Sequence, residues 1–307
     1  MMRRMPLIID CDPGHDDAMA LMLAVASPEL ELTAVTTVAG NQTIEKVTAN
    51  AIRVLDVAGS DVPVAAGAHR PLVHPADTAA DVHGESGLDG PDLPPPSRPP
   101  EDVHAVELMA RRLRERPHTL AAVGPLTNVA LLLAVHPELA GRIERLVIMG
   151  GAVGEGNVTP AAEFNIWVDP EAAQRVFTSD LDLTMVGLDV THQALLSAEA
   201  ADGLRAAGRA GAVVADLHAF YRRFHEQVYG HDSTPVHDAL AVASLIRPEL
   251  LGTELLPVEV ETGYGPARGR TIVDRLRRTG PGNARVALEV DADGFISLLC
   301  ERIARLP

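Results

Sequence analysis

Short apolar runs alternate with helical patterns along the first half of this chain of 307 residues. The runs "LIIDC", "LTAVTTV", "VPVAAG", "TLAAVG" and "RLVIMGG" read as buried strands over 7–11, 32–38, 62–67, 119–124 and 145–151. Apolar residues recur at helical spacing in the segments between them, at 16–26, 43–59 and 126–136. Parallel strands need crossover connections, which are usually helices. The alternation therefore predicts an α/β fold with an open, mostly parallel central sheet, covered by helices on both faces in the Rossmann-like manner.

The second half continues with helices and strands of similar length. We expect helices over 170–177, from about 198 to 229, over 237–246 and from about 293, and strands over 183–189, 256–261 and 284–290. The segment 89–102, "DGPDLPPPSRPPED", is too rich in proline for either and is expected to be a surface loop. Because no repeat or linker interrupts the pattern, residues 1–307 are expected to form a single large domain.

Four aspartates crowd into "DCDPGHDD" (10–17), directly after the first strand. The Pro-Gly turn lets Asp12 face the same space as Asp16 and Asp17 in the first helical turn. Ligands of open α/β sheets bind beyond the carboxyl ends of the strands, where this cluster lies. Helix capping explains one or two carboxylates but not four. Since close carboxylates repel and no histidine or cysteine falls at ligand spacing, a hard cation such as Ca²⁺ or Mg²⁺ is expected.

Two chemical classes use carboxylates at a strand end. In aspartyl phosphate chemistry an aspartate attacks phosphorus and a lysine stabilises the charge. In metal-assisted hydrolysis the ion lowers the pKa of a bound water and a carboxylate takes its proton. The only lysine, Lys46, falls in the second predicted helix, on a face with no obvious route to the aspartates. The turn between them contains Pro13 and Gly14, where the phosphatase pattern continues into threonine or valine. The residues therefore favour metal-assisted hydrolysis.

Composition narrows the partners and the location. The formal net charge is −16 and no block of basic residues is present, which argues against binding to nucleic acid. No run of about 18 apolar residues exists, so no membrane span is expected and a cytoplasmic location is predicted. Cys11 and Cys300 lie at opposite ends and suggest neither a disulfide framework nor a zinc site.

Eight segments together resemble the nucleoside hydrolases, the inosine-uridine preferring ribohydrolases. In family order they are "DCDPGHDDAMAL" (10–21), "VTTVAGNQT" (35–43), "HGESGL" (83–88), "GPLTNVAL" (124–131), "MGGAVGEGN" (149–157), "AEFNIWVDPEAA" (162–173), "TMVGLDVTHQAL" (184–195) and "VHDALAVA" (236–243). They cover nearly the whole chain, and their combination is highly specific. The resemblance implies a Ca²⁺-dependent enzyme that hydrolyses the N-glycosidic bond of ribonucleosides, pyrimidine nucleosides and/or inosine, to ribose and free base.

The resemblance also implies the metal ligands. Asp12 would bind calcium and deprotonate the calcium-bound water, while Asp17 and Asp238 would supply further carboxylates. The main-chain carbonyl of Val123 would complete the protein ligands; many relatives have threonine there, but a main-chain oxygen is indifferent to its side chain. Asp10 receives no direct role and is expected to orient the turn from behind.

Polar side chains implied to face the ribose are Asp16, Asn41, Asn157, Glu163 and Asn165, with Phe164 covering the sugar. Such residues can form hydrogen bonds as donors and as acceptors with the ribose hydroxyls, and would discriminate against 2′-deoxyribose. Without the resemblance, Asn41 and Asn157 read as turn residues. The alternation at 163–165 would read as a half-exposed strand.

A proton must reach the departing base, and His237 is the natural donor because a histidine pKa can sit near neutrality. A histidine at this position resembles the family branch that handles pyrimidine nucleosides and inosine. His83 is expected near the base as well. A stripe at helical spacing, Tyr221, Phe224, His225 and Tyr229, either walls the base or packs in the core.

The resemblance further implies a homodimer or homotetramer, with a nucleoside as the small-molecule partner. Two alternatives to the hydrolase stay open, an aspartyl-phosphate phosphatase and a non-catalytic nucleoside- or ribose-binding protein. The complete set of Asp12, Asp17, Asp238 and His237 argues against the second of these.

Overall fold

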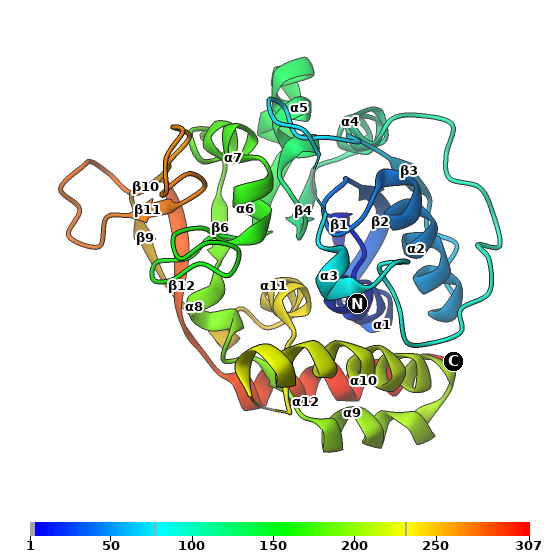
Figure 1. The fold of residues 1–307 in the computed structure, drawn as a ribbon. Helices are drawn as coiled ribbons and strands as arrows, with labels where there is room; N and C mark the ends of the chain where they lie inside the picture. The colour runs from blue at the N-terminus through cyan, green and yellow to red at the C-terminus, as the bar shows by residue number, and fades with distance from the viewer. Residues whose placement is uncertain (1–3, 77, 231) are drawn as a thin grey trace.

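A central sheet of eight strands organises the molecule, in the order β3-β2-β1-β4-β5-β6-β12-β9 (Figure 1). The computed structural model describes residues 4–76, 78–230 and 232–307. The strands of this sheet are β1 Met5–Cys11, β2 Leu30–Thr37, β3 Val64–Ala66, β4 His118–Ala122, β5 Ile143–Met149, β6 Leu183–Val186, β9 Leu251–Leu256 and β12 Ala284–Val290. All neighbouring pairs are parallel except β12 with the edge strand β9.

Helices cover both faces of the sheet. One face carries α1 His15–Ala26, α2 Ile44–Val57, α9 Ala198–Leu204, α10 Arg209–Tyr229, α11 His237–Ile246 and α12 Ala292–Ile303; the other carries α4 Ala105–Glu115, α5 Thr127–Val135 and α7 Pro170–Phe177. Along β1, Leu7 and Ile9 pack into the first layer while Ile8 packs into the second, as the two-residue period of a strand requires. The predicted α/β fold, with its open, mostly parallel sheet, is confirmed.

Short elements complete the chain. They are the helices α3 Ala80–His83, α6 Phe164–Val168 and α8 Leu188–Thr191, the 3₁₀ turns Pro137–Arg142, Arg205–Ala207 and Pro248–Leu250, and the strand pairs β7 Leu195–Leu196 with β8 Thr234–Pro235 and β10 Val258–Val260 with β11 Thr271–Val273. Of these, α3, α6 and α8 end or begin beside the candidate site described below.

Helix α1 is buried nearly all round, with every residue from His15 to Ala24 shielded from solvent. It lies against α2, α10, α11 and α12 rather than at the surface. Such a position explains its continuous apolar sequence, because a helix that is hydrophobic on all sides belongs in the core. The acids Asp16 and Asp17 in its first turn are therefore held at a buried helix N-terminus.

Two predicted strands have the wrong bounds. The strand expected over 183–189 ends at Val186; Gly187 is the N-cap of helix α8, which begins at Leu188. The strand expected over 256–261 is divided, since Leu256 ends β9 in the central sheet and β10 pairs with β11 outside it. Pro257 separates the two because proline has no N–H to continue a ladder.

Two other expectations also need correction. The helical region from about 198 to 229 is broken into α9, a 3₁₀ turn and α10, with Gly208 at φ 143° before α10, in a region of backbone conformation that favours glycine. The alternation at 163–165 is not a strand, because Glu163 caps helix α6. There the side-chain hydrogen bonds of the cap outweigh the two-residue pattern.

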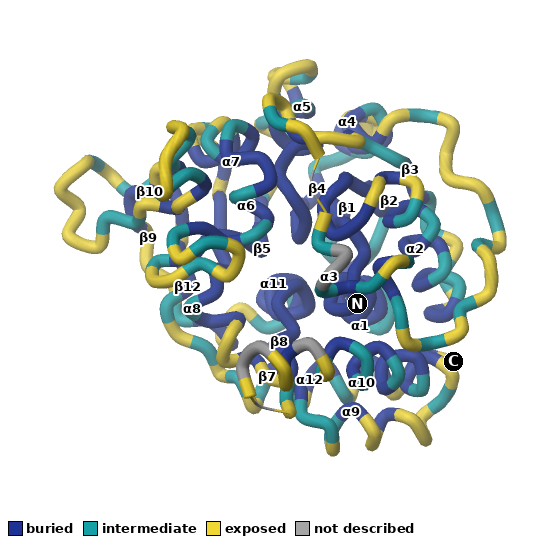
Figure 2. The backbone as a smooth tube through the Cα atoms, viewed as in Figure 1, coloured by how far each residue is buried: buried dark blue, intermediate teal, exposed yellow. Residues whose placement is uncertain are grey.

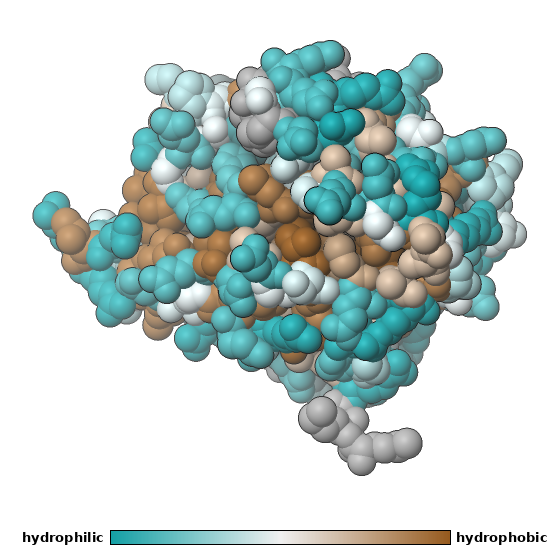
Figure 3. Space-filling view, turned by 90° about the horizontal axis from the view of Figure 1, so that it is seen from below, coloured by the Kyte–Doolittle hydropathy of each residue, from teal (hydrophilic) through white to brown (hydrophobic). Residues whose placement is uncertain are grey.

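The proline-rich segment 89–102 contains no helix or strand and runs along the outside of the molecule, as predicted (Figures 1 and 2). Arg98 ties it to α2 through Asp56, at 3.2 Å. No helix in the described ranges is long and apolar enough to cross a membrane. The face seen from below mixes hydrophobic areas with hydrophilic ones (Figure 3).

Candidate active site

A cavity of about 330 Å³ lies beyond the carboxyl ends of the central parallel strands. The predicted residues that line it are Asp16, Asn41, His83, Val123, Asn157, Glu163, Phe164, Asn165, His237 and Asp238. Asp12 and Asp17 do not line it but lie buried at its floor, 1% and 0% exposed. Lys46 is absent from the lining and donates to the main-chain carbonyl of Glu85. The structure thus gathers these residues from seven separate stretches of the chain at one strand-end crevice.

Three carboxylates at the floor come within 4.8 Å of one another, those of Asp16, Asp17 and Asp238. Asp17 is held by three donors, the amides of Asp12 at 3.1 Å and Gly14 at 2.9 Å and the side chain of Asn41 at 3.1 Å. The tight group contains Asp16, whereas the predicted ligand set contains Asp12. The assignment of Asp12, Asp17, Val123 and Asp238 as ligands stays a prediction.

Asp12 lies beside this group, and only one of its two carboxylate oxygens accepts a hydrogen bond from the described residues. Its Oδ2 accepts the amide of Asn41 at 2.7 Å, while its buried Oδ1 has no hydrogen-bond partner among the described residues. A Cβ at Gly40 would lie 2.2 Å from Oδ2 and one at Gly124 2.6 Å from Oδ1, so both positions need glycine. A buried oxygen without a donor, amid oxygen-only groups, fits a hard cation such as Ca²⁺.

Burial raises the pKa of each of these acids. The pKa of Asp16 rises to about 7 and that of Asp17 to about 6. For Asp12 and Asp238, burial and then the neighbouring carboxylates raise the pKa well above 3.8. Carboxylates packed this closely hold all their charges only when a cation compensates them. The carboxylates at the floor therefore need either bound protons or a metal ion to offset their negative charges.

The middle of the cavity is built around α6. Glu163 caps this helix by accepting the amides of Asn165 at 2.9 Å and Ile166 at 3.2 Å, and it also accepts the amide of Gly151 at 2.9 Å. Asn165 donates to the carbonyls of Val123 at 2.8 Å and Met149 at 3.1 Å. Asn157 accepts the amide of Phe164 at 3.0 Å. The polar side chains predicted to face a ribose are thus positioned mainly by main-chain groups.

Aromatic and histidine rings also line the cavity. His237 lies with Nδ1 2.7 Å from the hydroxyl of Thr191, and its ring meets that of His192 at 5.6 Å. A pKa near neutrality was expected for His237, but burial, with His192 and His225 nearby, lowers it to about 3. Burial, and then His15, also lowers the pKa of His83. Both rings are therefore neutral near pH 7.

Some lining residues were missed or left open by the sequence. His192, Leu195 and Pro235 line the cavity, and only the family-like segment 184–195 pointed toward the first two. Of the aromatic stripe on α10, Tyr221 and His225 line the cavity. The side chains of Phe224 and Tyr229 lie outside the described part of the structure.

Asp10, in β1, lies behind the floor and is linked to β2 and to helix α5. Its Oδ1 accepts the hydroxyl of Thr36 at 2.7 Å and the amide of Asn128 at 2.9 Å. Asn128 also donates to the carbonyl of Thr37 at 2.9 Å and accepts the amide of Ala68 at 2.9 Å. Burial raises the pKa of Asp10 to about 7. These contacts fit the predicted supporting role of Asp10.

Substitutions at Asp10 should distinguish how much its accepting oxygen and how much its charge contribute to stability. Asp10→Ala leaves the buried donors of Thr36 and Asn128 unpaired and is expected to lower the free energy of unfolding by about 2–4 kcal/mol. Asp10→Asn keeps an accepting oxygen and removes a buried charge, so a change within about 1 kcal/mol is expected. Urea denaturation of both variants measures this. Equal losses in the two variants would contradict the assignment of Oδ1 as an essential acceptor.

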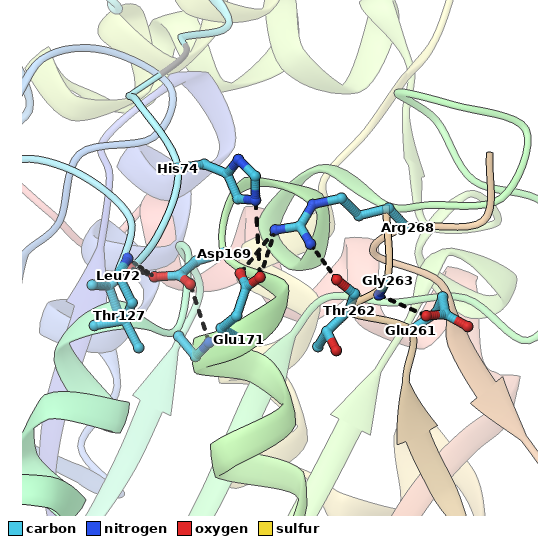
Figure 4. A network of polar contacts seen from close by, with 10 residues as sticks. Leu72, His74, Thr127, Asp169, Glu171, Glu261, Thr262, Gly263 and Arg268 are labelled. Atoms are coloured by element: carbon cyan, nitrogen blue, oxygen red, sulfur yellow. Dashed lines mark hydrogen bonds and ion pairs between the residues drawn. The ribbon is translucent and has the colours of Figure 1, made fainter. Parts of the chain in front are cut away.

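A second polar network braces α6 and α7 from outside (Figure 4). Asp169, fully buried, accepts the amide of Leu72 at 2.9 Å, the hydroxyl of Thr127 at 2.6 Å and the amide of Ala172 at 3.1 Å. Nearby, both oxygens of Glu171 accept from Arg268 at 2.8 Å. These contacts connect α7 with α5, with the segment that leads toward α3 and with the β10–β11 hairpin.

Comparisons with known proteins agree on one family. The model of the family described as inosine-uridine preferring nucleoside hydrolase matches residues 7–297. The pyrimidine-specific ribonucleoside hydrolase RihA of Citrobacter koseri is 51% identical over 306 residues, which cover 98% of each chain.

Solved structures show the same similarity. A plant nucleoside hydrolase superposes with a TM-score of 0.93 at 34% identity, covering 99% of this chain and 100% of its own. A purine-preferring ribonucleoside hydrolase from Gardnerella vaginalis superposes with a TM-score of 0.92 at 34% identity, covering 97% and 98%. The likeness therefore extends over the whole sheet and both helical layers.

Proposed function

This chain belongs to the inosine-uridine preferring nucleoside hydrolase family, and we propose on that premise that it hydrolyses the N-glycosidic bond of pyrimidine ribonucleosides to ribose and free base. The observation that best supports this is the cavity itself, with buried carboxylates at its floor and neutral histidines in its lining. The preference for pyrimidines rests on the name of the RihA relative. Uridine incubated with the protein should yield equal amounts of uracil and ribose, measured by chromatography and a reducing-sugar assay.

We assign the buried carboxylates at the floor of the cavity as a calcium-binding site. The carboxylates of Asp12, Asp17 and Asp238 and the carbonyl of Val123 would hold it, which suits the oxygen-only preference of Ca²⁺. When bound, such an ion offsets the buried negative charge and lowers the pKa of water. The tight approach of Asp16 to Asp17 and Asp238 supports a cation that is shared by the whole floor.

Asp12 is the proposed base. Its Oδ2 is fixed by the amide of Asn41, so the side chain presents Oδ1 in one orientation. Asp12, held in one orientation in this way, would take the proton of the attacking water.

The ribose would occupy the middle of the cavity. Its hydroxyls would meet Asp16, Asn41, Asn157, Glu163 and Asn165, and Phe164 would cover its ring. Departure of the base leaves positive charge on the sugar, as in other glycoside cleavages, and carboxylates close to the ring stabilise that charge. Burial raises the pKa of Glu163 to about 7, so this group can donate as well as accept near neutral pH.

The departing base would receive its proton from His237. Only the imidazolium form of His237 can give up a proton near neutral pH, so the ring would first take a proton from solvent; its contact with the Thr191 hydroxyl would hold the ring in place. The low pKa of His237 keeps the ring uncharged at rest, and negative charge that builds on the departing base would raise this pKa, so that the ring is protonated as the base leaves.

His237→Ala should therefore slow uridine much more than a substrate whose leaving group needs no proton. We expect kcat for uridine to fall by about 10²- to 10⁴-fold, and kcat for p-nitrophenyl riboside to change several-fold at most. Steady-state kinetics on both substrates measure the difference. Equal losses on the two substrates would rule out His237 as the proton donor.

A further inference from the structure

His15, in the middle of the aspartate-rich turn, is fully buried and does not line the cavity. Its ring stacks on those of Phe220, Tyr221 and His83, each with centroids 5.3 Å away. Both of its ring nitrogens are engaged. Nε2 lies 2.9 Å from the main-chain carbonyl oxygen of Asp89, and Nδ1 lies 3.0 Å from Nδ1 of His83. A histidine held at both nitrogens, behind a ring that lines the cavity, can control that ring.

The two contacts determine where the protons lie. A carbonyl oxygen only accepts, so Nε2 of His15 carries a proton. Neither hydrogen bond of His15 reaches a carboxylate, and the cost of burying an imidazolium outweighs the attraction of the nearby Asp89, so the ring is neutral and its Nδ1 is bare. In the contact between the two Nδ1 atoms, His83 must then be the donor.

One competing contact points to the same His83 nitrogen. The main-chain amide of His15 lies 3.4 Å from Nδ1 of His83 and could donate only to a bare nitrogen. At 3.4 Å this contact is near the limit of a hydrogen bond, whereas the contact between the rings is 3.0 Å. Two bare nitrogens at 3.0 Å would repel, so the shorter contact decides the tautomer.

A neutral His83 with its proton on Nδ1 has a bare Nε2. The Nδ1 and Cε1 atoms face Gly14, where an added Cβ would lie 2.7 and 2.8 Å from them. Nε2 of His83 has no hydrogen-bond partner among the described residues and is not a fully buried atom, and His83 lines the cavity. His83 thus offers the cavity an acceptor.

We propose that His15 is a positioning residue that fixes His83 in the Nδ1–H tautomer, so that Nε2 of His83 accepts a hydrogen bond from an N–H group of the pyrimidine base. Uracil offers N3–H and cytosine its exocyclic amino group as the donor. The inference rests on the proposed function, because it needs a nucleobase in the cavity. In this arrangement His83 recognises the base and does not protonate it.

Three variants separate the contacts of His15. His15→Asn places an oxygen where Nδ1 stood and can still accept from His83. His15→Gln can still reach the Asp89 carbonyl but offers His83 nothing. His15→Phe keeps the stacked ring and loses both hydrogen bonds.

The kinetic test compares uridine with 3-methyluridine and p-nitrophenyl riboside. We expect His15→Phe and His15→Gln to lower kcat/KM for uridine by about 10- to 100-fold, mainly through KM, and to lose discrimination against 3-methyluridine. His15→Asn should stay close to the unmodified protein, and p-nitrophenyl riboside, which has no N–H to offer, should be affected little in all three. Parallel losses on uridine and p-nitrophenyl riboside would overturn the proposal, because they would indicate a purely structural role.

A spectroscopic test needs no activity. Long-range ¹H–¹⁵N spectra of histidine-labelled protein, assigned with His83→Gln, report which nitrogen of His83 is bare. The proposal predicts a bare Nε2 in the unmodified protein and in His15→Asn, and a gain of Nε2–H in His15→Phe. A protonated Nε2 in the unmodified protein overturns it. If no nucleoside is cleaved while Nε2 is bare, the proposed function fails and the tautomer assignment stands.

Discussion

Asp12→Asn is expected to lower kcat for uridine by about 10²- to 10⁴-fold or more, which is the usual contribution of a general base, with loss of a metal ligand added to it. Asparagine has nearly the same shape and its oxygen can still accept the amide of Asn41, so the fold should be retained. Stopped assays for released uracil measure the loss. Asp10→Asn is the matched control, because it removes a charge from the same strand end but not from the proposed reaction.

Asp12→Asn should lower activity but leave the stability of the metal-free protein unchanged or increase it. Asp12 is buried beside Asp17 and Asp16, and these neighbours and burial raise its pKa. Removing its charge relieves this repulsion in the metal-free protein, so Asp12→Asn should unfold at the same or a higher urea concentration. An Asp12→Asn protein that stays folded and cleaves uridine at the original rate would contradict the assignment of the base.

Removal of calcium is expected to destabilise the protein and to abolish activity. Binding of an ion only to the folded state adds about 2.7 kcal/mol at a free concentration of 100 times Kd. Thermal unfolding with excess Ca²⁺ and with a chelator measures this difference. Asp238→Asn should lose most of the response, because one of the proposed carboxylates is gone.

The stability of the protein should depend on pH differently in the metal-free and in the calcium-bound state. Without metal, the folded protein holds protons on Asp16 and Asp17, with pKa values of about 7 and 6, that the unfolded chain releases near 3.8. Stability from these groups is therefore present below about pH 4 and is lost as the pH rises through about 6 to 7. Bound Ca²⁺ would displace these protons from the carboxylates into solvent, so the unfolding temperature should not fall over that range. Identical slopes with and without Ca²⁺ would exclude a metal at this floor.

The place of the site could be predicted because it depends on local rules. A Pro-Gly turn after a buried strand, followed by acids in the first helical turn, determines where Asp12, Asp16 and Asp17 lie. The structure puts them at the cavity floor. The grouping within the floor was not predictable, since the amide of Asn41, which is distant in sequence, fixes Asp12 to one side of the closest three carboxylates.

Long-range packing explains the other differences. Nothing in the sequence "LPVEVE" shows that Pro257 divides two strands that pair with different partners. The pKa of His237 depends on burial and on His192 and His225, which come from other segments. The contact of His15 with His83 joins residues that are 68 positions apart. The oligomeric state and the cytoplasmic location stay predictions.

Hydrolysis in water enriched in ¹⁸O tests the central claim most directly. Uridine and the unmodified protein with Ca²⁺, in a buffer free of phosphate, should give ribose that carries one solvent oxygen at C1, and uracil that carries none. Asp12→Asn under the same conditions should give neither product. Release of uracil that requires phosphate, label in the uracil, or intact uridine after prolonged incubation would contradict hydrolysis of the N-glycosidic bond by this site.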